Sequence, residues 1–426
     1  MSPTREQHMS SYLNPAPFSY RFLILLSVSL MLVGNYFAYD SIGALAPLII
    51  DNMGLDREAI GMMYSFYSWP NLFMVFLAGI LIDRYGTRTM SLVFSALIVL
   101  GSVIVAAAPV FWLMLFGRTI FGIGAEALIV CQSVILTKWF KGKELAFSFG
   151  LALTFMRLGT LLSFHVEGWI AQIFSWRFAL SVAALLCAFS MLFNLAYVIL
   201  EKKALGQIRL TVVPANDRIV LSDIRKFGSS YWYITALAVT FYSAIFPFTA
   251  FSTDMFVDKW DYSVVTAGRI SGIVIMASMI LAPLLGRIVD RVGNRSNMML
   301  AGSLILIPCH LAMGLTDWNP IPSMIVLGFS FSLVPAALWP AVPFLVDGKA
   351  IGTAFGLMTM IQNFGLAIFP WTIGSLRDTS QDYTNAMMVF ATLGLLGLIF
   401  SLLLRQSDAQ AGGILDKIES PVEGTH

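Results

Sequence analysis

The chain has 426 residues, of which 58% are hydrophobic and only 12% are charged, and its formal net charge is +2. Soluble globular proteins carry about 25% charged residues, so this composition excludes a disordered chain and argues against one large soluble domain. The nearly balanced charge gives no reason to expect a nucleic-acid partner. A chain of this length has room for about a dozen membrane spans of about 20 residues each. The composition therefore predicts an all-α polytopic membrane protein that contacts the lipid bilayer.

Twelve long apolar runs follow one another along the chain. Each is expected to be helical, because backbone N–H and C=O groups find no water inside a bilayer. The runs cover residues 22–50, 59–82, 89–109, 112–137, 145–170, 177–200, 230–256, 263–285, 297–315, 321–346, 350–374 and 386–404. A polar stretch that contains Pro214 separates six runs from six. The predicted units are an N-terminal segment (1–21), a six-helix bundle (22–200), a linker (201–229), a second six-helix bundle (230–404) and a mobile tail (405–426).

The lysine and arginine residues are distributed unevenly between the two sides of the predicted spans. Of the 26, 19 lie on the side of the two termini, four lie on the other side, and three lie within spans. Because basic loops stay in the cytoplasm, we expect both termini there. Residues 1–20 hold no acidic dileucine-type sorting string, and the N-x-[ST] sequon at Asn294 falls on the cytoplasmic side. We therefore expect a bacterial inner membrane, with the lysosomal membrane as the alternative.

One ten-residue pattern occurs in both halves of the chain. Gly79-Ile-Leu-Ile-Asp83-Arg84-Tyr-Gly86-Thr-Arg88 corresponds to Gly286-Arg-Ile-Val-Asp290-Arg291-Val-Gly293-Asn-Arg295, 207 residues further along. Such a duplication predicts two pseudo-symmetric halves with a binding site between them near the membrane midplane. The two aspartates and their neighbouring arginines can form charge-assisted bonds between helix ends. We interpret these loops as a gate or latch rather than a substrate site.

The repeated G-x-x-x-D-R-x-G-x-R pattern resembles the signature loop of the major facilitator superfamily. Gly117-Arg118-x-x-x-Gly122-x-Gly124 is similar to a second motif of that superfamily. The resemblance covers about residues 20–405. It implies a secondary transporter with twelve transmembrane helices in two pseudo-symmetric six-helix bundles, and a monomer by family default. We expect no enzymatic activity, no cofactor and no metal.

Longer strings resemble the lysosomal dipeptide transporter branch of the superfamily and its bacterial relatives. They are Tyr67-Ser-Trp69-Pro70-Asn71, Phe121-Gly-Ile-Gly-Ala-Glu126, Trp139-Phe-Lys-Gly-Lys-Glu144-Leu, Arg157-Leu-Gly159, Ala337-Leu-Trp339-Pro340 and Ile361-Gln362-Asn363-x-Gly365-Leu-Ala-Ile. This resemblance implies a carrier that moves dipeptides as a uniporter, and it assigns substrate binding to Glu126 and Arg157.

The residues support the same two positions independently. Glu126 and Arg157 lie near the middle of consecutive spans, and charges at that depth are costly and usually functional. A dipeptide is a zwitterion, so Glu126 could accept its ammonium group while the guanidinium fork of Arg157 holds its carboxylate. Neutral Asn363 stands at the repeat-equivalent position of Arg157, which breaks the symmetry where a ligand would lie. The alternative is a buried ion pair that only holds the bundle together.

The other candidates are polar or aromatic groups within spans, each with helix packing as its alternative role. The candidates for substrate contact are Tyr64, Tyr67, Trp339, Gln362 and Asn363, and those for proton coupling or substrate access are Asp40 and Arg118. Few groups are dedicated to a substrate side chain, so we expect broad side-chain tolerance.

Two rival functions remain open. A proton-coupled carrier for another small anion would also use Arg157, with Glu126 or Asp40 titrating. A membrane-embedded sensor or enzyme is disfavoured, because the sequence has no H-E-x-x-H, G-x-S-x-G or phosphate-loop motif. Transport of a small molecule is therefore the favoured function.

Overall fold

The computed structural model describes residues 18–140, 144–205, 227–346 and 351–416. Residues 1–17 of the predicted N-terminal segment, residues 206–226 of the predicted linker and residues 417–426 of the predicted tail lie outside this range. The described chain is helical, with short connections. Its helices are α1 (Phe18–Leu30), α2 (Val33–Ala44), α3 (Ala46–Met53), α4 (Arg57–Ser68), α5 (Asn71–Ala107), α6 (Phe111–Phe140), α7 (Leu145–Ile173), α8 (Trp176–Leu205), α9 (Ser229–Trp260), α10 (Val264–Val292), α11 (Arg295–Leu315), α12 (Ile321–Leu345), α13 (Ile351–Ser380) and α14 (Thr384–Gln410).

Eleven helical segments of the described chain are long and apolar enough to cross a membrane. One of them, Arg57–Ala107, has 51 residues, whereas one crossing needs about 20. The helix is interrupted at Gly86, whose φ of 82° and ψ of 156° are not helical and favour glycine. α4 with the first part of α5 therefore makes one crossing, and the rest of α5 makes the next. The prediction of twelve transmembrane helices is confirmed, and the protein is an all-α multi-pass membrane protein.

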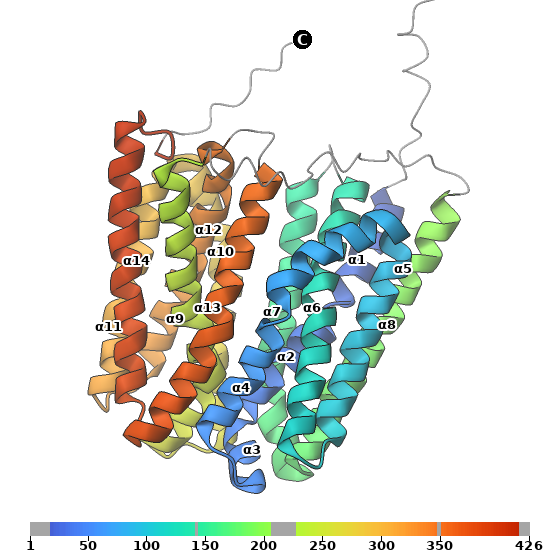
Figure 1. Cartoon of the computed structure of the whole chain (residues 1–426), viewed down its shortest axis with the longest axis vertical. Helices are drawn as coiled ribbons and strands as arrows, with labels where there is room; N and C mark the ends of the chain where they lie inside the picture. The colour runs from blue at the N-terminus through green and yellow to red at the C-terminus, as the bar shows by residue number, and fades with distance from the viewer. Residues whose placement is uncertain (1–17, 141–143, 206–226, 347–350, 417–426) are drawn as a thin grey trace, which may run out of the picture.

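The helices form two bundles that lie side by side, α1–α8 and α9–α14 (Figure 1). The start of α1 and the end of α14 lie at the same face of the molecule, at the top of Figure 1. We call this the terminal face and the opposite one the distal face.

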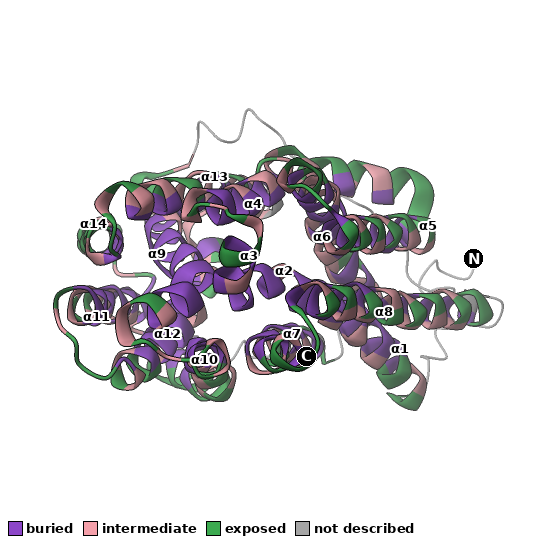
Figure 2. Ribbon diagram, turned by 90° about the horizontal axis from the view of Figure 1, so that it is seen from below, coloured by how far each residue is buried: buried purple, intermediate pink, exposed green. Residues whose placement is uncertain are grey.

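The most extensive contacts between the bundles are those of α4 with α13 and of α7 with α10 (Figure 2). Smaller contacts join α2 with α9 and α5 with α13. Glycines permit the closest approaches. A methyl group on Gly61 would lie 2.2 Å from the carbonyl oxygen of Pro370, and one on Gly374 would lie 2.5 Å from that of Arg57. Such distances are far below van der Waals contact, so the backbones of α4 and α13 touch because neither glycine has a side chain.

The glycines that begin the two signature loops have different surroundings. A methyl group on Gly79 of α5 or on Gly286 of α10 would meet no described atom within 4 Å. These two positions correspond in the repeat and lie toward the terminal face. The tight packing between the bundles is thus concentrated toward the distal face.

The C-terminal segment differs from the expected mobile tail. α14 continues to Gln410, and the chain then folds back onto the start of α11. The Asp416 carboxylate accepts hydrogen bonds from the Ser296 backbone N–H at 3.1 Å and from the Ser296 hydroxyl at 2.7 Å, while Leu415 is fully buried. The first turn of a helix has free N–H donors, and Asn294 makes no side-chain cap bond there. Asp416 therefore caps α11 from a distant part of the sequence.

Candidate functional site

Glu126 lies near the middle of α6 and is half-buried. Its Oε1 atom accepts a hydrogen bond from the hydroxyl of Tyr67, at 3.0 Å, where α4 packs on α6. No described cation lies within ion-pair distance of this carboxylate. An accessible carboxylate at this depth without a cationic partner can receive the ammonium group of a ligand.

Arg157 lies on α7 and is also half-buried. Its guanidinium carbon is 4.2 Å from the centroid of the Phe331 ring, which belongs to α12 in the other bundle. It makes no hydrogen bond or ion pair with any residue that the structure describes. Tyr36 of α2 lies within electrostatic reach of both Arg157 and Glu126, so the fold brings the two predicted charges into one region.

Phe331 belongs to a group of neighbouring aromatic rings in the second bundle, which we call the aromatic wall: Tyr242, Phe331, Trp339 and Phe355. The Trp339 indole donates a hydrogen bond to the Tyr242 hydroxyl at 2.7 Å and stacks on Phe355, with ring centroids 6.0 Å apart. Tyr242 in turn meets Phe331 edge-on at 6.5 Å. Trp339 is half-buried and is therefore placed where a substrate side chain could contact it.

Arg118 has different surroundings from Arg157, although both are arginines within the membrane. It is 1% exposed, and its guanidinium carbon lies 5.3–5.4 Å from the ring centroids of Tyr39, Tyr64, Tyr67 and Phe121. Its Nε atom donates to the carbonyl of Met63 at 3.3 Å. The geometry favours a packing role for Arg118.

Tyr64 belongs to the same set of rings. Its hydroxyl accepts a hydrogen bond from the backbone N–H of Gly43 at 2.9 Å, and it is 2% exposed. Of the two predicted tyrosines, Tyr67 contacts Glu126, whereas Tyr64 is packed between α2 and Arg118.

Three further predicted residues, on α2 and α13, make no hydrogen bond or ion pair with Glu126 or Arg157 in the described structure. Asp40 is buried in α2, within electrostatic reach of Arg118 and Arg157. On α13, Asn363 is buried, and the Oε1 atom of Gln362 is buried without a hydrogen-bond partner. A role for these residues in substrate or proton binding stays a prediction.

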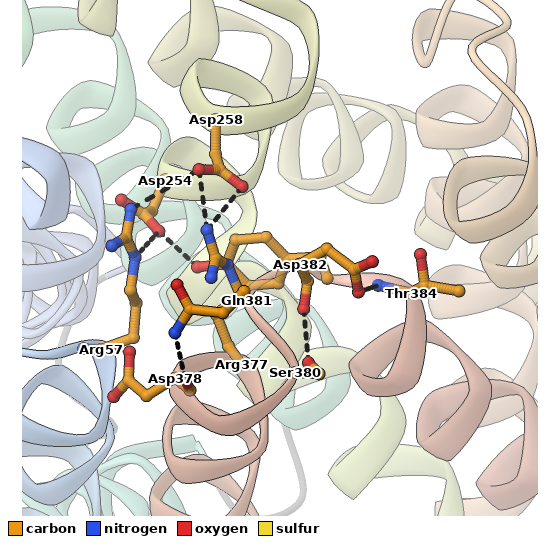
Figure 3. A network of polar contacts seen from close by, with 10 residues as sticks. Arg57, Asp254, Asp258, Arg377, Asp378, Ser380, Gln381, Asp382 and Thr384 are labelled. Atoms are coloured by element: carbon orange, nitrogen blue, oxygen red, sulfur yellow. Dashed lines mark hydrogen bonds and ion pairs between the residues drawn. The ribbon is translucent and has the colours of Figure 1, made fainter.

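An ion-pair network, absent from the predicted sites, joins the two bundles at the distal face (Figure 3). The Nε atom of Arg57, at the start of α4, lies 3.0 Å from the Asp254 carboxylate of α9, and its Nη2 atom lies 3.7 Å from Asp258. Arg377 of α13 binds both oxygens of Asp258 at 2.8 and 2.9 Å. We call these four residues the distal network.

Two neighbours extend the distal network. The carboxylate of Asp378, on α13, accepts hydrogen bonds from the backbone N–H groups of Arg57 at 3.0 Å and Glu58 at 2.7 Å. It thereby caps α4 from the opposite bundle. Tyr383 donates to Asp254. Burial, together with the nearby Asp254 carboxylate, raises the pKa of Tyr383 above its ordinary value, so this phenol keeps its proton.

The first signature loop makes no latch between the bundles in this conformation. Asp83 and Arg84 are exposed, and the described residues offer Asp83 no ion pair. Arg88 lies 3.8 Å from Glu201 of α8, within its own bundle. A latch here stays a prediction for a conformation in which the terminal face is closed.

The second signature loop is turned toward its own bundle. Arg291 is exposed, whereas Arg295 is buried with its guanidinium 4.8 Å from the ring of Phe344. Gly293 has a φ of 65°, which ends α10 at a conformation that favours glycine. The side chain of Asp290 lies outside the described part of the structure.

Sequence reasoning named Tyr67 and Trp339 but missed the other rings of the aromatic wall and the distal network. Phe331 and Tyr242 lie within uniformly apolar runs, where no local pattern distinguishes a site residue from a packing residue. Arg57 and Arg377 could have been singled out from the sequence, since they are two of only four basic residues on the predicted non-cytoplasmic side. Basic residues that are rare on one side are candidates for ion pairs with specific carboxylates.

Two helical bundles side by side, a signature loop in each half and charged groups between the bundles are typical of a secondary transporter. The sequence profile described as Major Facilitator Superfamily matches residues 28–370 and 260–422. The chain belongs to the major facilitator superfamily, and it is a transporter of a small-molecule substrate rather than an enzyme.

Curated relatives and solved structures agree with this assignment. The chain is 36% identical over 385 residues to the lysosomal dipeptide transporter MFSD1 of Danio rerio, covering 87% of this chain and 84% of the relative. It is 32% identical to the protein of the same name in Homo sapiens, covering 97% and 92%. Its fold is similar to that of a mutant form of the nucleoside transporter NupG, with a TM-score of 0.73, 17% identity, and 90% and 99% of the chains covered.

Proposed function

We propose that the protein is a uniporter for dipeptides that works by alternating access. The observation that supports this most is the accessible pair Glu126 and Arg157 on the adjacent helices α6 and α7. Neither side chain has an ionic partner in the described structure, and together they match the two charged ends of a zwitterion. The relatives named dipeptide transporters share 32–36% of their residues with this chain.

The proposed binding mode assigns one terminus to each charge. Glu126 and the hydroxyl of Tyr67 receive the substrate ammonium group, and the fork of Arg157 receives its carboxylate. The peptide side chains then lie against the aromatic wall, which offers contact area with few directional groups. Such a wall tolerates many side chains, so broad selectivity follows.

The direction of opening follows from the proposed topology. We place the terminal face in the cytoplasm, because 19 of the 26 basic residues lie on that side. The distal network and the glycine contacts then close the outer side, and this conformation opens inward.

The test is flux into liposomes that contain the purified protein. We expect uptake of labelled dipeptides, competition by dipeptides of varied side chains, and little competition by single amino acids, whose charges are closer together. For a uniporter, the initial rate of uptake should be the same with and without a pH gradient across the liposome membrane, when the internal pH is the same in both experiments. Absence of dipeptide-dependent flux, with uptake of another solute, would refute the proposal.

A second candidate is a proton-coupled carrier of a small organic or inorganic anion. The unpaired guanidinium of Arg157 and the buried Asp40 within its electrostatic reach favour this alternative. The two functions differ in their response to a proton gradient: a proton-coupled flux should rise with an inward proton gradient, and a uniporter flux should not. If Asp40 is the group that titrates, E126Q should keep the flux of a simple carboxylate, whereas a dipeptide carrier should lose dipeptide flux in E126Q.

The membrane itself is also a proposal. We favour a bacterial inner membrane, and the lysosomal membrane of the named relatives is the alternative. Localisation of the full-length protein in its native cell distinguishes the two.

A further inference from the structure

The contact between Arg157 and Phe331 is closer than a chance approach of a long side chain to a ring. At 4.2 Å it is the shortest arginine–ring distance in the described structure; the next is 4.5 Å, between Arg177 and Trp176. The contact is a cation–π attraction between the guanidinium and the ring, and it leaves the N–H donors without a hydrogen-bond acceptor. Those donors have no partner among the described residues, so a carboxylate can bind them without displacing the ring.

The ring of Phe331 is itself fixed. It is 2% exposed, and two rings of α9 meet it edge-on: Phe246 at 5.7 Å with an interplanar angle of 87°, and Tyr242 at 6.5 Å with 82°. Edge-to-face pairs of this kind hold a ring in one orientation. Phe331 is therefore a rigid platform of the second bundle, while the half-buried arginine that lies on it belongs to the first bundle.

We propose that Phe331 is a specificity-determining residue that positions Arg157 for the substrate carboxylate. This inference rests on the proposed dipeptide function. The ring limits the rotamers of Arg157 and presents the guanidinium edge to the ligand. The carboxylate subsite is then complete only when α7 and α12 lie close enough for Arg157 to contact Phe331. Affinity for a free C-terminus therefore depends on the arrangement of the two bundles.

The experiment compares two ligands that differ at one group, a dipeptide and its C-terminal amide. Binding of each to purified full-length protein is measured by calorimetry for the wild type and for F331L, F331M, F331W and F246L. The ratio of the two dissociation constants reports the carboxylate subsite alone. F331M serves as the second ring-free variant if F331L does not fold, and F246L removes one of the two rings that hold Phe331 in its orientation.

For the wild type we expect much tighter binding of the free acid than of the amide. F331L and F331M should weaken binding of the free acid about tenfold and leave binding of the amide unchanged. The two dissociation constants then become more similar, and their ratio moves toward one. F331W, which keeps a ring under the guanidinium, should restore the ratio. F246L, which removes one of the two rings that orient Phe331 but keeps Phe331 itself, should bring the ratio closer to one by less than F331L does.

An unchanged ratio in the ring-free variants, or an equal loss for both ligands, overturns the proposal and leaves Phe331 with a packing role. If the wild type transports dipeptides but does not discriminate the free acid from the amide, the role of Arg157 at the carboxylate is wrong and the positioning role falls with it. If the wild type neither binds nor transports dipeptides, the proposed function itself is wrong.

Discussion

At the scale of single residues, the same side chain has two different environments in this membrane protein. Arg118 is enclosed by rings and backbone carbonyls and is 1% exposed, whereas Arg157 is accessible and rests on one ring. A caged guanidinium contributes packing and charge compensation, and an accessible one offers unused donors. The environment, and not the residue type, separates a structural arginine from a binding one.

Replacement of Glu126 by glutamine tests the acidic half of the proposed site. E126Q keeps the size and the hydrogen bond with Tyr67 but removes the negative charge. We expect loss of dipeptide flux by at least about tenfold, since a charge-assisted bond to the ammonium group becomes a neutral one. Flux into liposomes and the melting temperature are measured together.

The control for E126Q is D51N, which neutralises an exposed carboxylate of α3. Exposed charges contribute little to stability, so D51N should transport like the wild type. Normal flux in E126Q would contradict its assigned role.

Lysine substitutions at the two arginines should have opposite effects. R157K keeps the charge but loses the bidentate fork, so we expect dipeptide affinity to fall about tenfold with little change in melting temperature. R118K loses contacts with several rings at once, so the melting temperature should fall while the affinity of the folded fraction is kept. The same pair of measurements on both variants checks this, and equal effects in both would contradict the distinction.

Glu126 and Arg157 could be predicted from the sequence because charges are rare inside apolar runs. Phe331 and Tyr36 could not, because the chain has 33 phenylalanines and 13 tyrosines, and a ring in a span looks the same whether it faces a ligand, a helix or lipid. Their roles depend on which residues of a distant helix lie opposite, which no local pattern encodes.

At the scale of helices, two N-termini are capped by remote segments. Asp378 of α13 caps α4, and Asp416 of the C-terminal segment caps α11. The helix bounds could be read from the apolar runs to within a few residues. The two caps could not be predicted from the sequence, because the residue that caps each helix is 320 or 120 positions away.

Removal of the Asp416 carboxylate should destabilise the second bundle. D416A leaves the first N–H groups of α11 without their partner, and the loss of a helix cap costs about 1 kcal/mol. We expect a lower melting temperature in detergent, with a similar loss on truncation after Gln410. D317A, at a side chain that is 94% exposed, is the control and should not change it.

Enlargement of Gly61 should prevent closure of the distal face. A valine side chain there would overlap the carbonyl of Pro370, because even a methyl group would lie 2.2 Å from it. We expect G61V to fold but to lose flux, with distal positions more reactive toward a water-soluble thiol reagent. G228V, where a side chain meets no described atom, lies outside the signature loops and should transport normally, and active G61V would contradict the proposed closure.

At the scale of the whole molecule, the distal network and the glycine contacts hold the bundles together at one face. Twelve helices in two repeated units could be predicted from the sequence, because each half carries its own signature loop. The conformation of the bundles could not be predicted from the sequence. A carrier sequence encodes more than one arrangement of its bundles, and the same signature loops are present in each.

Neutralisation of Asp254 should shift the molecule toward distal-open conformations. D254N leaves Arg57 without the partner that lies 3.0 Å away, and loss of one partner of a buried pair is costly. Spin labels at N52C and N319C, on exposed positions of α3 and the α11–α12 connection, report the separation of the bundles by pulsed EPR. We expect longer distances in D254N and partial recovery in the charge-swapped variant R57D/D254R.

The control for the distance measurement is D382N. This carboxylate binds the backbone N–H of Thr384 within its own bundle, so its change should leave the distances as in the wild type. Unchanged distances in D254N as well would show that the ion pair does not hold the distal face closed.

The cap that Asp378 provides to α4 also makes the state of the carrier visible without labels. When the bundles separate at the distal face, the backbone amides of Arg57 and Glu58 lose their acceptor, and their hydrogens become free to exchange with solvent deuterium. A substrate that favours the present arrangement should slow that exchange, and one that drives the carrier away from it should speed it. Hydrogen exchange in the first turn of α4, measured by mass spectrometry, therefore reports in unmodified protein whether the distal face is open or closed.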